Sequence, residues 1–92
     1  MGLVALYRVN SEQARPVYEF VEMMRRRYPG RTIKELDIDT RDGSAEASLY
    51  GIVSYPALIS TSLDGRVLGI WEGLPLPLID EVVGSIVELQ TV

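Results

Sequence analysis

An amphipathic helical pattern enclosed by two strand patterns is the feature that most restricts what this chain can fold into. Residues 3–8 form a short apolar run, and residues 32–39 alternate apolar and charged side chains. Both patterns are typical of strands. Between them, apolar residues recur every three or four positions and make one helical stripe: Ala14, Val17, Phe20, Val21, Met24 and Tyr28. Two strands joined through a helix are expected to be parallel with a right-handed crossover, which predicts an α/β fold.

The ends of this helix carry signals of their own. Asn10 or Ser11 is predicted to cap its N-terminus, with Gln13 three residues after Asn10, as in a capping box. A run of three arginines followed by a Pro-Gly pair predicts where the helix ends. Pro16 either still belongs to the first turn or kinks the helix.

The second half of the chain predicts a short helix, two strands and a last helix, in that order. The Asp-Gly pair at 42–43 predicts a turn, and residues 45–50 predict a short helix that ends at Gly51. Two strands, residues 57–62 and 66–71, enclose a Leu-Asp-Gly sequence that favours a hairpin. After two prolines, the last helix has its apolar stripe at Ile79, Val82, Val83, Ile86 and Leu89.

Together these elements predict one domain over residues 1–92. Their order is β-α-β-(α)-β-β-α. We expect a mixed four-stranded sheet, parallel in its first pair and antiparallel in its hairpin, with helices on both faces. The apolar share of 47% and the charged share of 24% are those of an ordinary globular protein.

The residue types that are missing exclude several classes of site. The chain has no Cys and no His, which excludes thiol redox chemistry and the usual zinc sites, and removes the usual general base at neutral pH. Residues 37–43 look like a calcium loop, but Arg41 takes a ligand position and Ser48 stands where the bidentate Glu belongs. We therefore expect no metal, no cofactor and no enzymatic activity.

Charge and hydropathy bear on the partners of the chain. The formal net charge is −4, which argues against nucleic-acid binding. Five basic residues lie between Arg25 and Lys34, and we interpret them as a helix end and a solvated loop, with an anion- or nucleic-acid-binding patch as the alternative. The apolar run at the start is too short for a signal peptide or a membrane span. We expect a cytoplasmic protein that does not bind membranes.

One part of the chain resembles the thioredoxin superfamily. Residues 36–39 and 50–52 look like the strand and short helix that lead to its active-site loop. Residues 50–58, read as Y-G-I-V-S-Y-P-A-L, resemble the family's Y-G-I-x-x-x-P-T-L segment. Residues 64–67 fall where the family has its hairpin turn, and Gly73 where it has a glycine after the last strand. The resemblance implies a thioredoxin-like fold, close to glutaredoxin in size.

The loop after the first strand departs from this family. Thioredoxins have C-x-x-C there, whereas this chain reads R-V-N-S-E-Q-A over residues 8–14. Counting from the strand puts Ser11 and Ala14 at the two cysteine positions, and counting back from Pro16 puts Arg8 and Ser11 there. Neither alignment supplies a thiolate, so the chain is expected to be redox-inactive.

The resemblance also implies a binding surface. In the family the proline equivalent to Pro56 is cis, and the residue before it offers main-chain hydrogen bonds to an extended peptide or to glutathione. We therefore predict that a protein or peptide partner binds a cleft formed by Asn10, Ser11, Ser54, Tyr55 and Pro56. The alternative is that Pro56 only shapes the start of a strand. Glutathione binding is disfavoured, because the polar pair that glutaredoxins carry after the last strand is missing from residues 72–75.

A second candidate surface lies around the last strand. Trp71, Leu74 and Leu76 cluster there with two prolines. They are either core residues or, if the strand at 66–71 is a sheet edge, part of a homodimer interface. The leading hypothesis is thus a non-catalytic binding module. The alternatives are a dimerising subunit with a vestigial cleft and a glutathione-binding enzyme.

Overall fold

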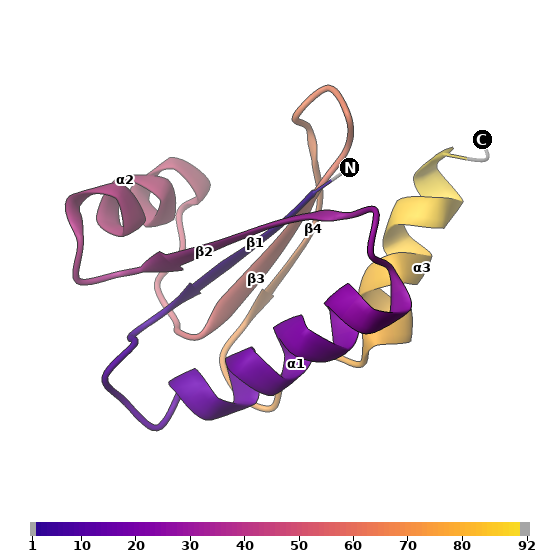
Figure 1. Ribbon diagram of the computed structural model, residues 1–92. Coiled ribbons are helices and arrows are strands. Elements are labelled where there is room, and N and C mark those ends of the chain that lie inside the picture. Colours follow the sequence, from indigo (N-terminus) through magenta and orange to yellow (C-terminus); the bar gives the residue numbers. More distant parts are fainter. Residues whose placement is uncertain (1, 91–92) are drawn as a thin grey trace.

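The structure, a computed structural model, describes the main chain of residues 2–90 and the side chains of residues 2–84. Its elements follow the predicted order (Figure 1). They are β1 (Gly2–Tyr7), α1 (Ala14–Arg27), β2 (Thr32–Asp37), α2 (Arg41–Tyr50), β3 (Ala57–Thr61), β4 (Val67–Glu72) and α3 (Ile79–Gln90). No helix within this described part is long and apolar enough to cross a membrane.

The four strands form one mixed sheet in the order β2-β1-β3-β4. β1 pairs parallel with β2 and antiparallel with β3, and β3 pairs antiparallel with β4. The predicted mixed sheet is therefore confirmed. β1 reads as a continuous apolar run because it is central and both its faces are covered. Leu3, Ala5 and Tyr7 face one cluster of the core, and Val4 and Leu6 face the other.

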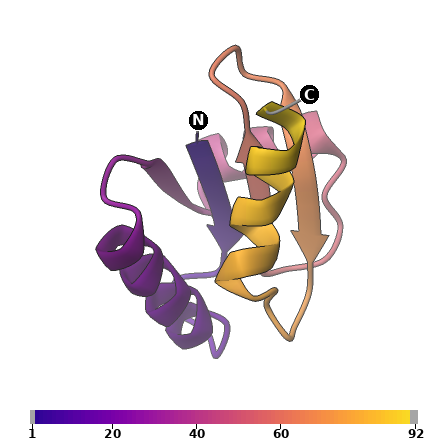
Figure 2. The same cartoon turned by 90° about the vertical axis from the view of Figure 1, so that its right-hand side faces the viewer.

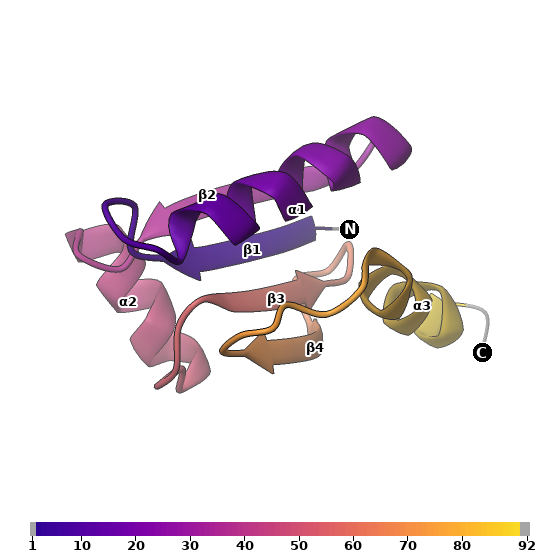
Figure 3. The same ribbon diagram turned by 90° about the horizontal axis from the view of Figure 1, so that it is seen from below.

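The helices divide between the two faces of the sheet. α1 lies over β1 and β2, and α3 lies over β3 and β4 on the same face (Figures 2 and 3). Their buried residues join the larger core cluster, which includes Val17, Phe20, Leu58 and Val82. α2 lies on the opposite face and contributes Ala47 to a smaller cluster. Both faces are thus covered, as predicted.

The first helix begins later than its polar residues suggest. Its N-cap is Gln13, which makes no side-chain capping hydrogen bond. The prediction that Asn10 or Ser11 caps it was wrong, because residues 10–13 form a turn in which the N–H of Ala14 donates to the carbonyl of Ser11. Pro16 stands in the first turn, where its missing N–H has no intrahelical partner to lose.

α2 is longer than predicted. The Asp-Gly pair at 42–43 is not a turn but part of the first helical turn, which the Thr40 side chain caps by accepting from the N–H of Gly43. A Cβ at Gly43 would lie 1.9 Å from the carbonyl oxygen of Asp37, so the glycine lets α2 pack directly against the end of β2. Gly51 ends the helix in the left-handed conformation (φ 67°), as predicted.

The remaining boundaries differ from the predictions by one or two residues. β2 stops at Asp37, whose carbonyl accepts hydrogen bonds from the N–H and hydroxyl of Thr40. The predicted hairpin is present, with Gly65 at φ 85° in its turn. In α3, Ile79, Val82 and Val83 are buried as predicted. The side chains of the other two predicted stripe positions, Ile86 and Leu89, lie outside the described residues.

Candidate functional site

Two loops lie at the same end of the sheet, where β1 ends and β3 begins (Figure 1). Residues 8–13 connect β1 to α1, and residues 51–56 connect α2 to β3. We call these two segments together the loop surface. It contains all five residues predicted for the cleft. The two loops meet because β1 and β3 are antiparallel neighbours, so that the end of β1 lies beside the start of β3.

Ser11 holds the first of these loops in shape. Its hydroxyl donates to the carbonyl of Arg8 at 2.6 Å and accepts from the N–H of Gln13 at 3.2 Å. Both contacts are local, so the Ser11 hydroxyl stabilises a turn before the helix. Asn10 is exposed beside it.

Gln13 joins the two loops and is the residue that the sequence interpretation missed. Its side-chain amide donates to the main-chain carbonyl of Tyr55 at 3.3 Å, and its side-chain carbonyl accepts from the N–H of Arg8 at 3.2 Å. The only role predicted for Gln13 from the sequence was in a capping box with Asn10. No spacing rule could have identified this contact, because the two residues are 42 positions apart.

The second loop is held more firmly. The Tyr55–Pro56 peptide bond is cis, and Pro56 is buried. The carbonyl of Pro56 accepts from the N–H of Gly73 at 2.8 Å. Glu72, at the end of β4, accepts from the N–H groups of Val53 and Ser54 at 3.0 and 3.3 Å. Ser54 is exposed and Tyr55 half-buried, so the segment 53–55 is fixed in place and still accessible.

Charged groups flank the loop surface on the side of β2. The Arg8 guanidinium contacts both carboxylate oxygens of Asp39, at 3.0 and 3.3 Å. The hydroxyl of the buried Tyr7, the residue before Arg8, donates a hydrogen bond to the Glu35 carboxylate at 3.3 Å. Burial, with smaller contributions from Tyr18 and Glu35, raises the pKa of Tyr7 above its ordinary value. Tyr7 therefore stays protonated at neutral pH and acts as a hydrogen-bond donor.

The chemistry available at the loop surface is hydrogen bonding. The polar groups brought together there are hydroxyls, an amide, main-chain groups and the Arg8–Asp39 ion pair. Within the described part of the chain, no group of three or more acidic residues is placed to hold a metal ion. These groups can align and hold an extended partner chain.

The predicted interface residues divide between core and surface. Trp71 and Leu76 are partly buried and pack against the larger core cluster, whereas Leu74 is 56% exposed. The Trp71 ring lies against Gly69, where a Cβ would come within 2.6 Å of it. β4 is at the edge of the sheet, as the interface prediction required.

Four of the five basic residues around the end of α1, all but Arg26, have partners among the described residues. Arg25 pairs with Glu22 and Glu35, Arg27 with Asp80, and Lys34 with Glu46. The Arg31 guanidinium lies over the Tyr28 ring. This arrangement favours the interpretation of these residues as a helix end and a solvated loop over that of an anion-binding patch.

Comparison with solved structures identifies the fold. Thioredoxin O2 from Arabidopsis thaliana superposes with a TM-score of 0.69 at 16% identity, over 98% of this chain and 69% of that one. Thioredoxin 1 from Thermosipho africanus gives 0.71 at 10% identity, over 99% and 96%. Fasciola hepatica thioredoxin gives 0.72 at 16% identity, over 95% and 78%. The chain has a thioredoxin-like fold. The sequence itself matches no family model and no curated protein.

This thioredoxin-like fold contains no cysteine. The loop after β1, where thioredoxins carry their C-x-x-C, is here built from Arg8, Ser11 and Gln13 contacts. The loop before β3 keeps the proline. The predicted fold is thus confirmed, and the thiol chemistry of thioredoxin is excluded because a thiolate is required for it.

Proposed function

We propose that this chain is a non-catalytic protein- or peptide-binding module and that its partner binds the loop surface in an extended conformation. The observation that carries the proposal is the hydrogen bond from the Gln13 side chain to the Tyr55 carbonyl. Here the side-chain amide of Gln13, at the start of α1, donates to the main-chain carbonyl of Tyr55, the residue just before Pro56. The N–H of an extended peptide is the same kind of donor and can take its place.

The construction of the 51–56 loop supports this proposal. The loop is fixed by Glu72, by Gly73 and by buried Pro56, so a partner would not have to order it on binding. The hydrogen bonds of Tyr55 use its carbonyl and its hydroxyl. Its N–H is therefore the natural donor for a second main-chain bond to a peptide. Val53, 82% exposed, offers an apolar contact beside it.

The test is a titration of the ¹⁵N-labelled chain with a pool of unstructured ten-residue peptides, followed by NMR. We expect shifts at Ser11, Gln13, Ser54 and Tyr55. Gln13→Ala frees the Tyr55 carbonyl, so peptides should bind this variant about two- to tenfold more tightly, the equivalent of one net hydrogen bond. Glu12→Ala, which changes an exposed neighbour, is the matched control. No shift at these positions in either the natural chain or Gln13→Ala, at millimolar peptide, would overturn the proposal.

A parallel titration with glutathione tests the enzymatic alternative. Glutathione shifts at the same residues, without peptide shifts, would favour a glutathione-binding protein. We expect none, because the residues after β4 are Gly73 and Leu74 rather than a polar pair.

A second candidate function is that of a dimerising subunit whose loop surface is vestigial. It is favoured by the exposure of Leu74 and by the position of β4 at the sheet edge. We also propose that the chain works in the cytoplasm.

A further inference from the structure

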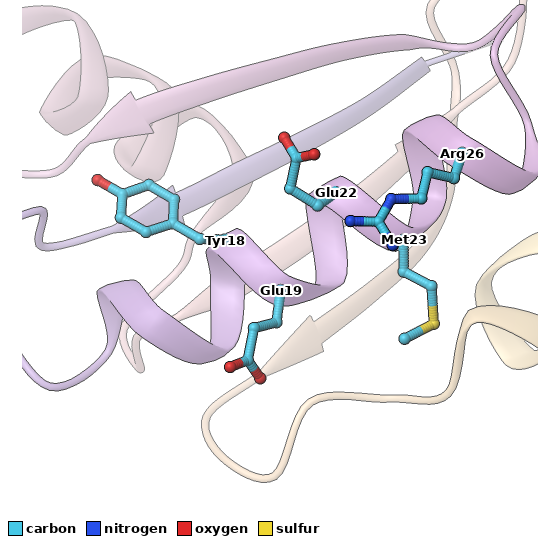
Figure 4. Close-up of a pocket in the computed structure, with 5 residues that line it drawn as sticks. All are labelled: Tyr18, Glu19, Glu22, Met23 and Arg26. Atoms are coloured by element: carbon cyan, nitrogen blue, oxygen red, sulfur yellow. The ribbon is translucent and has the colours of Figure 1, made fainter.

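An apolar groove runs between α1 and the segment that follows β4. Its volume is about 660 Å³. Pro16, Phe20 and Met23 of α1 form one wall, and residues 74–76 form the other. Glu19 is the only charged residue among the described residues that line the groove. In Figure 4, Glu19 and Met23 leave α1 on the side of this segment, whereas Tyr18 and Glu22 leave it on the other side. The groove is separate from the loop surface.

The groove continues onto the outer face of α1. A second hollow of about 400 Å³ shares Glu19 and Met23 with it and adds Tyr18, Glu22 and Arg26 (Figure 4). Three large apolar side chains on this combined surface are about half exposed: Met23 at 49%, Tyr18 at 45% and Leu74 at 56%. A continuous apolar surface of this kind, bordered by charges, is typical of an interaction site.

The charges on α1 indicate which partner fits. Its acidic residues, Glu19 and Glu22, lie in the middle turns, and its last turn is Arg25, Arg26 and Arg27. Arg25 and Arg27 are paired within the chain. Arg26 makes no ion pair with any described residue, and Glu19 has only the solvent-exposed Arg15, at 3.4 Å. An exposed pair of that kind contributes little and is readily exchanged.

A second α1 running antiparallel to the first would give Arg26 an acidic partner and would give Glu19 a second basic partner besides Arg15. If the two helices cross near Met23, Glu19 of each lies opposite Arg26 of the other, because 19 and 26 are almost equally far from 23. A two-fold axis repeats this ion pair, and the same surface then serves both subunits. The apolar residues around Met23 would occupy the centre, with the charges at the border.

We propose that this surface, Met23 and Leu74 at its centre and Glu19 and Arg26 at its border, is where a second copy of the chain docks. The inference rests on the dimerising candidate above and gives it an interface. It does not involve the loop surface or the β4 edge.

The first test is sedimentation velocity from about 10 µM to about 1 mM, the range in which a small interface associates. The natural chain should shift from monomer to dimer. Met23→Glu places two like charges at the axis, so it should remain monomeric throughout. Leu63→Glu is the matched control, because Leu63 is 86% exposed at the hairpin turn, and it should dimerise like the natural chain.

Charge reversal tests the antiparallel geometry. Glu19→Arg and Arg26→Glu should each weaken the dimer about tenfold, and the double variant should recover most of the loss. A chain that is monomeric at 1 mM, a dimer that Met23→Glu leaves intact, or a double variant that does not recover would each overturn the proposal. The peptide titration with Met23→Glu keeps the two proposals apart, because peptide shifts at Tyr55 do not depend on dimerisation.

Discussion

The two halves of the loop surface are built differently. Residues 51–56 are held from within: Ile52 belongs to the smaller core cluster, Pro56 is buried, and Glu72 and Gly73 bind the main chain. Residues 8–13 are held by exposed polar contacts. Arg8 pairs with Asp39 at the surface, and the Ser11 and Gln13 side chains bind neighbouring main-chain groups.

This difference indicates what each half of the loop surface would do when a partner binds. The 51–56 half is a rigid platform whose shape is fixed by folding. The 8–13 half consists of contacts worth little individually, which a partner can replace. If the chain binds a peptide, the platform should align it and the polar half should adapt.

Removing the core contact of the platform should have the largest effect. Ile52→Ala deletes a side chain that is 7% exposed, and we expect a loss of about 2–4 kcal/mol in the free energy of unfolding. Urea unfolding followed by circular dichroism measures it. Val53→Ala, one residue on and 82% exposed, is the matched control and should change stability by less than about 0.5 kcal/mol. Equal effects of the two variants would contradict the description of this half as core-supported.

Removing the carboxylate beneath the platform should have a smaller effect. Glu72→Ala leaves the N–H groups of Val53 and Ser54 without their acceptor. Because these groups are solvent-accessible, we expect a loss of about 1 kcal/mol. Amide hydrogen exchange at Val53 and Ser54 should become faster. Glu72→Gln keeps an acceptor oxygen and should retain most of the protection, whereas unchanged exchange in Glu72→Ala would show that Glu72 does not hold the loop.

The same difference explains what could be predicted from the sequence. The two ends of the 51–56 loop were predicted because their determinants are local: Gly51 ends a helix and Pro56 precedes a strand, and both can be identified from neighbouring residues. The mixed sheet could be predicted from the order in which strand patterns and helical patterns follow one another along the chain. The Asp-Gly pair at 42–43 was assigned to a turn, because its helical role depends on the capping by Thr40 and on the close approach to Asp37.

The polar half could not be predicted in the same way. Ser11 suits a helix cap by residue type, yet its hydroxyl binds Arg8 and the helix begins three residues later. The contact of Gln13 with Tyr55 depends on tertiary structure. Residue type and the family resemblance indicated two loops that the fold brings to the same end of the sheet, while the pairing of side chains across them required the positions of both strand ends.

The smallest effect is expected from the ion pair at the border of the polar half. Arg8 and Asp39 have side chains that are 52% and 57% exposed, so water screens their attraction. Arg8→Ala should lower the free energy of unfolding by less than about 1 kcal/mol, and a double-mutant cycle with Asp39→Ala should give a coupling energy that decreases as salt is added. A salt-independent coupling above about 2 kcal/mol would mean that the polar half is as firmly built as the platform. In that case the Arg8–Asp39 pair would have to stay in place when a peptide binds the loop surface.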